Sequence, residues 1–137
     1  MLLVLDASVI AKWFKEEENS KQALKIREKF YKGEHEIIVP DLILYELSNA
    51  LRYDKKFNPK LITKAINTLF EMDINITIPS GELISETVKI ATENNITAYD
   101  ATYIALSTKT NATFITADNK LIQKIKHLKN CKPLSDF

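Results

Sequence analysis

The 137-residue chain has little cysteine, little glycine and no long apolar run. The single cysteine, Cys131, excludes an intrachain disulfide and a thiolate-rich zinc site, and it indicates a reducing compartment, so we expect a cytoplasmic protein. The two glycines, Gly33 and Gly81, are too few for a phosphate-binding loop or a dinucleotide fingerprint. The apolar run 2–5 stops at Asp6, and no stretch approaches the ~20 residues that a membrane span needs. We therefore expect neither a signal peptide nor a membrane segment.

A strong excess of charge of one sign is also missing. Nineteen basic residues oppose 18 acidic ones, for a net charge of +1, so any contact with a polyanion must be local. Residues 52–64 hold five basic residues and one acidic residue, which fits either a nucleic-acid contact or an ordinary solvated helix face. His35 and His127 lie in hydrophilic stretches without a helical partner, so we expect both at the surface.

The remaining composition, 45% hydrophobic and 27% charged, is that of a globular protein with the length of one domain. Short apolar runs alternate with amphipathic stretches, which predicts strands separated by helices. This order predicts a three-layer α/β/α sandwich around a mainly parallel sheet of four to five strands, forming a single domain over residues 1–137. The predicted strands are residues 2–5, 36–39, 74–78, 113–115 and 130–133, and the predicted helices are residues 7–14, 20–31, 40–53, 59–72, 81–94, 98–108 and 118–128.

Two carboxylates fall where a helix should be apolar. Glu46 lies within the apolar arc of the helix around residues 42–51, where an unpaired charge costs several kcal/mol. A buried salt bridge, or a rotated helix that exposes Glu46, would explain it without a function. Asp100 is the only charged residue between positions 96 and 108. Its place near a helix N-terminus also fits a capping role.

Two further carboxylates follow predicted strands. Asp6 comes directly after the first strand, and Asp118 lies just beyond the strand at 113–115, so both belong to the sheet edge where α/β proteins bind ligands. Helix capping is the alternative for each. Four converging carboxylates would repel one another without a cation, and oxygen ligands suit Mg²⁺ or Mn²⁺. Ser8 and Thr116 could orient these carboxylates, or form only turn and cap hydrogen bonds.

Short motifs along nearly the whole chain are similar to those of a known family. They are Val4-Leu5-Asp6-Ala7-Ser8, Val39-Pro40, Tyr45-Glu46-Leu47 with Asn49-Ala50-Leu51, Tyr99-Asp100-Ala101 with Tyr103-Ile104-Ala105-Leu106, and Ile115-Thr116-Ala117-Asp118 with Leu121. In order and spacing they resemble the PIN-domain (PilT N-terminal) ribonucleases, and among them the small VapC-like toxins of toxin-antitoxin pairs. The resemblance assigns the acidic catalytic and metal positions to Asp6, Glu46, Asp100 and Asp118, and the supporting hydroxyls to Ser8 and Thr116.

The resemblance implies an endoribonuclease that cleaves RNA with a metal-activated water and one or two Mg²⁺ or Mn²⁺ ions. It also implies a homodimer and a cognate antitoxin, for which Trp13, Phe14, Tyr53 and Phe57 are candidate surface aromatics, with core packing as the alternative. A stand-alone RNA-processing nuclease and a catalytically inactive RNA-binding module remain open. A phosphotransfer receiver domain would need an acceptor aspartate and a matching lysine that the sequence does not place.

Overall fold

A computed structural model describes residues 1–137 and contains one five-stranded sheet in the order β3-β2-β1-β4-β5, with every neighbouring pair parallel. Seven α-helices flank it, which confirms the predicted fold class. The strands are β1 (Leu2–Leu5), β2 (Glu36–Pro40), β3 (Asn75–Thr77), β4 (Thr113–Thr116) and β5 (Cys131–Pro133). The helices are α1 (Ala7–Ile10), α2 (Ser20–Tyr31), α3 (Leu42–Arg52), α4 (Pro59–Glu71), α5 (Gly81–Asn94), α6 (Ala98–Thr110) and α7 (Asn119–Ile125), with 3₁₀ turns at Ala11–Trp13 and Leu134–Asp136.

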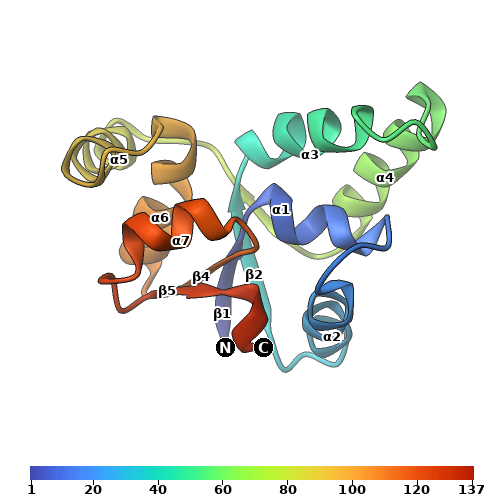
Figure 1. Ribbon diagram of the computed structural model, residues 1–137, viewed down its shortest axis with the longest axis horizontal. Helices are drawn as coiled ribbons and strands as arrows, with labels where there is room; N and C mark the ends of the chain where they lie inside the picture. Colours follow the sequence, from blue (N-terminus) through green and yellow to red (C-terminus); the bar gives the residue numbers. More distant parts are fainter.

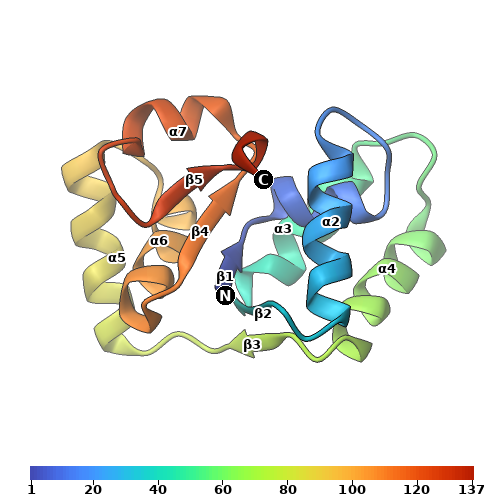
Figure 2. The same ribbon diagram turned by 90° about the horizontal axis from the view of Figure 1, so that it is seen from below.

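Helices cover both faces of the sheet. Helices α1–α4 lie on one side and α5–α7 on the other, as Figures 1 and 2 show from two directions. The central strand β1 is therefore enclosed, and Leu3, Val4 and Leu5 are all fully buried. A continuous apolar run without alternation is what a strand covered on both faces requires. None of the helices has both the length and the apolar character needed to cross a bilayer.

Several predicted helix boundaries are wrong. The first predicted helix, residues 7–14, is α-helical only to Ile10, and α6 runs two residues past its predicted end. Pro40 ends β2 and is paired with Thr77 of β3, whereas the sequence suggested that it opens the next helix. The backbone N–H of Asp41 donates to the Thr77 carbonyl at 2.9 Å, so the sheet pairing extends past Pro40, and α3 begins only at Leu42. Helix α7 ends at Ile125, three residues before the predicted end, because the chain then enters turns leading to β5.

The surface assignments also need correction. His35 is buried at 8% exposure, and its Nδ1 has no hydrogen-bond partner. Trp13 is buried at 6% exposure, where its Nε1 donates to the Ala23 carbonyl at 2.9 Å, so the core-packing alternative holds for this residue. Phe14 and Phe57 are half-buried against the core, and only Tyr53 is strongly exposed.

Candidate active site

The candidate site lies at the carboxyl edge of the sheet. Strands β1 and β4 are parallel neighbours, and Leu5 is paired with Ile115. This register brings Asp6, the residue after β1, beside Thr116, the last residue of β4. Asp118 follows two residues later as the N-cap of α7. Two segments more than a hundred residues apart in sequence thus meet at one point.

Asp6 is the most buried of the four predicted carboxylates, at 6% exposure. Its Oδ1 accepts hydrogen bonds from the backbone N–H and the hydroxyl of Ser8, at 3.1 and 2.5 Å. Its Oδ2 accepts the Thr116 hydroxyl at 2.5 Å. The two hydroxyls are in turn acceptors, Ser8 Oγ for the N–H of Ala117 at 2.9 Å and Thr116 Oγ1 for the N–H of Asp118 at 3.1 Å. Both oxygens of Asp6 are therefore fixed by neighbours that are themselves held by the backbone.

Glu46 is half-buried on α3 and is oriented by a tyrosine from the opposite helical layer. The hydroxyl of Tyr103 on α6 donates to Glu46 Oε1 at 2.6 Å. Tyr103 is itself buried at 1% exposure, and its ring stacks on Phe114 of β4 with centroids 6.1 Å apart. No lysine or arginine forms a salt bridge with Glu46, so the simple buried ion-pair explanation does not apply.

Asp100 and Asp118 have different local roles. The cap of α6 is Thr97, whose Oγ1 accepts the N–H of Asp100 at 3.1 Å, so capping does not explain Asp100. Asp118 is exposed and caps α7, because its Oδ1 accepts the N–H of Leu121 at 3.0 Å. Asp6 likewise caps the short helix α1. The capping alternative therefore holds as a local structural role for Asp6 and Asp118.

The electrostatics of the site oppose full ionisation. The pKa of Asp6 is raised to about 6: burial raises it most, the hydrogen bonds from Ser8 and Thr116 lower it, and the charges of Asp100 and Glu46 raise it. Burial also raises the pKa of Glu46, as does the charge of Asp100, while the Tyr103 hydroxyl lowers it. The pKa of Asp100 is raised by burial and then by Asp118, and lowered by Thr97 and Lys124. These carboxylates are close enough to repel one another.

The donor set fits a hard divalent cation in its chemistry. All four side chains offer carboxylate oxygens, and none of the four takes part in a salt bridge. A bound cation would stabilise such a site, because it would neutralise the negative charges that repel one another. No group of three or more acidic, histidine or cysteine side chains is drawn together into a compact ligand set, however.

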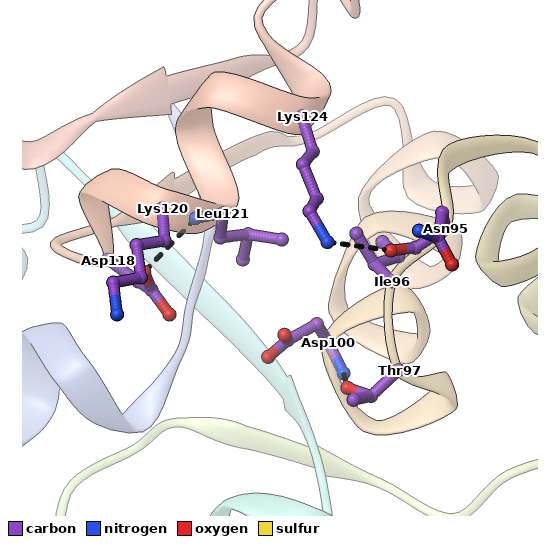
Figure 3. Close-up of a pocket in the computed structure, with 8 residues that line it drawn as sticks. All are labelled: Asn95, Ile96, Thr97, Asp100, Asp118, Lys120, Leu121 and Lys124. Atoms are coloured by element: carbon purple, nitrogen blue, oxygen red, sulfur yellow. Dashed lines mark hydrogen bonds between the residues drawn. The ribbon is translucent and has the colours of Figure 1, made fainter.

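A pocket of about 380 Å³ adjoins the carboxylates. It opens between α7 and the α5–α6 turn, and the Asp100 carboxylate points into it (Figure 3). The lining is mostly polar and consists of Asn95, Ile96, Thr97, Asp100, Asp118, Lys120, Leu121 and Lys124. The acidic edge is thus continuous with a space large enough for part of a ligand.

Sequence reasoning missed Tyr103 as a site residue. Tyr103 lies three residues after Asp100 and so on a neighbouring part of the helix surface, but α6 carries many other hydroxyl groups. That spacing was the available signal. The partner, Glu46, lies 57 residues away in sequence, and only the packing of α3 and α6 over one sheet edge reveals the pair.

Fold and site together define an α/β protein with a group of carboxylates beside a pocket at the carboxyl edge of a parallel sheet. The model of the PIN domain family matches residues 3–128, and the chain belongs to that family. It is 30% identical over 138 residues to Ribonuclease VapC3 of Pyrobaculum aerophilum, covering 93% of this chain and 98% of the relative.

Solved structures show the same fold at lower identity. VapBC-1 from nontypeable Haemophilus influenzae superposes with a TM-score of 0.69 and 20% identity, covering 98% of this chain and 99% of that one. A toxin-antitoxin complex from Klebsiella pneumoniae gives a TM-score of 0.70 and 14% identity, covering 96% and 97%. At these identities the likeness concerns the fold alone.

Proposed function

We propose that this protein is an endoribonuclease that hydrolyses RNA phosphodiester bonds with Mg²⁺ or Mn²⁺ at its four carboxylates, and that it acts as the toxin of a toxin-antitoxin pair. Membership of the PIN domain family supports the nuclease activity, as does the similarity to a relative named a ribonuclease. The complexes among the structural neighbours support an antitoxin partner. A homodimer is part of the same proposal.

One observation carries the metal-dependent part of this proposal. Asp6 is buried beside two further carboxylates with no basic side chain paired to any of them, and burial raises its pKa. Asp6, Glu46, Asp100 and Asp118 would hold the ion. Magnesium commonly binds through one or two carboxylates and several waters, so a compact set of three is not required. When bound, such an ion makes water a better nucleophile and stabilises charge on the phosphate.

The chain's own residues would keep these ligands in place. Ser8 and Thr116 each hold one oxygen of Asp6, which restricts rotation of the carboxylate. Tyr103 does the same for Glu46 from the opposite helical layer. Groups that orient ligands in this way contribute strongly to ion affinity, typically by 10- to 100-fold.

Replacement of Asp100 by asparagine tests the function. We expect Asp100→Asn to reduce Mn²⁺-dependent cleavage of single-stranded RNA by about 100-fold or more, because a charged ligand is lost. The fold should remain intact, since the Thr97 cap binds the backbone of Asp100. Cleavage products are resolved by gel electrophoresis, and circular dichroism checks the fold.

Glu36→Gln provides a matched control. Glu36 is exposed and begins β2, so it lies at the opposite edge of the sheet, and its variant should cleave like the wild type. Full activity of Asp100→Asn would reject the proposed role of this residue. A wild-type protein that binds RNA in EDTA but never cleaves it would indicate an inactive RNA-binding module.

A further inference from the structure

We propose that the pocket between α7 and the α5–α6 turn is a binding site for a backbone phosphate of RNA, with Lys120 and Lys124 as its ligands. This inference deepens the proposed nuclease function and rests on it. Lys120 and Lys124 are four residues apart on α7, so they project from the same side of the helix. Both line the pocket together with Asp100 and Asp118 of the candidate site.

Lys124 is held in place but keeps free donor capacity. Its Nζ donates to the backbone carbonyl of Asn95 at 3.0 Å (Figure 3). Asn95 ends α5 in a left-handed conformation, with φ of 52°, which asparagine adopts more easily than most residues. An ammonium group has three N–H donors, so two remain for a ligand. Neither Lys120 nor Lys124 is engaged in a salt bridge.

The charge balance of the pocket favours an anion once the carboxylates hold a cation. The lining contains two lysines and two aspartates, and only Ile96 and Leu121 are apolar. Because the proposed ion would neutralise Asp100 and Asp118, the two ammonium groups would leave the pocket positive. The lining has four charged side chains and no aromatic one, which suits a phosphate better than a nucleobase, since a base would need aromatic surfaces for stacking.

The position of the pocket indicates which phosphate it takes. A scissile phosphate must lie against the carboxylates, and the pocket shares two of these with the site. The neighbouring phosphate of the same strand is the next anion along the substrate. Binding it at Lys120 and Lys124 would fix the direction in which the RNA crosses the sheet edge.

The test is the salt dependence of RNA binding by the full chain. A short fluorescein-labelled single-stranded RNA is titrated in Ca²⁺ at several salt concentrations, with gels to confirm that it stays intact. We expect Lys120→Gln and Lys124→Gln each to weaken binding about threefold to tenfold and to reduce the slope of log affinity against log salt by about 0.7. In Mn²⁺, KM should rise while kcat changes by less than about twofold.

Two variants control the result. Lys126→Gln makes the same charge change at an exposed residue outside the pocket and should leave affinity and slope close to wild type. Lys124→Arg keeps the positive charge, so its RNA affinity and salt slope should be close to those of the wild type. The inference would be overturned if the two pocket variants kept the wild-type slope of log affinity against log salt. It would also be overturned if Lys126→Gln weakened RNA binding as much as they do. A pocket that binds a protein partner instead of RNA would give the unchanged slope. Failure of the wild type to cleave RNA in Mn²⁺ would instead count against the nuclease function. The two results are distinguishable, because the salt dependence of RNA binding tests the phosphate site without cleavage.

Discussion

Asp6 is buried, and when no cation is present burial favours the protonated form of its carboxyl group over the charged one. Its pKa rises from the ordinary 3.8 to about 6 on folding, chiefly through burial. The folded protein therefore binds a proton more tightly than the unfolded chain, and its stability is greatest below about pH 4 with respect to this group. The free energy of unfolding should fall as pH rises from about 4 to 6, and level off above that, by about 3 kcal/mol in total.

Asp6→Asn should remove most of this dependence. Asparagine cannot ionise, so metal-free unfolding by urea should show a much flatter slope against pH between 4 and 6 than the wild type does. The slope is the informative quantity, because the amide also disturbs the hydrogen bonds with Ser8 and Thr116 and shifts stability at every pH. A slope equal to that of the wild type would show that Asp6 ionises normally in the folded protein.

Tyr103 gives a second prediction for a single side chain. Tyr103→Phe removes the 2.6 Å hydrogen bond with Glu46 but keeps a ring to stack on Phe114. Since a hydrogen bond to a charged group contributes about 1.5–3 kcal/mol, we expect a loss of that size in the free energy of unfolding at pH 7. In a Glu46→Gln background, Tyr103→Phe should lower the free energy of unfolding by less. A double-mutant cycle of urea unfolding measures the difference. Equal costs in both backgrounds would rule out the charge-assisted bond.

At the scale of elements, Asp118 is the N-cap of α7 and also lines the pocket. Alanine and asparagine separate the two roles, because asparagine caps helices as well as aspartate does and alanine does not. Asp118→Ala should lower stability by about 1 kcal/mol, whereas Asp118→Asn should change it little. Both should lose RNA cleavage if the carboxylate binds the ion. An active Asp118→Asn variant would leave Asp118 as a cap only; thermal unfolding and the RNA assay provide the two measurements.

The elements also show what the sequence could reveal. Apolar or β-branched runs located four of the five strands, and a charge inside an apolar helix singled out Glu46 as a candidate, because both signals are local. Residues 130–133 are not an apolar run and were expected only as a final edge strand, the place where β5 lies. Pro40 misled the prediction, since proline fits the first turn of a helix as well as the end of a strand. The restriction that proline places on Val39 favoured the strand. Contacts between Asp6 and Thr116 depend on β1 and β4 being neighbours, a property of strand order that no short pattern contains.

At the scale of the whole molecule, the sheet order places the site between two helical layers. Helix α3 lies on one side of the sheet and α6 on the other (Figure 1). The Tyr103 hydroxyl of α6 nevertheless donates to Glu46 of α3 at 2.6 Å. The carboxylates that raise one another's pKa values therefore come from elements on both sides of the sheet. A cation bound there would relieve the repulsion and stabilise the complete fold.

Thermal unfolding with and without Mn²⁺ tests this link. A ligand that binds only the folded state adds about 2.7 kcal/mol of stability at a concentration 100 times its Kd, so Mn²⁺ should raise Tm at pH 7. The rise should be smaller at pH 5, because the proton on Asp6 competes with the ion. Asp100→Asn should reduce the shift, and Glu36→Gln should preserve it. A Tm rise shared equally by all three proteins would reflect ion binding elsewhere on the surface, and the carboxylates would then not form the metal site.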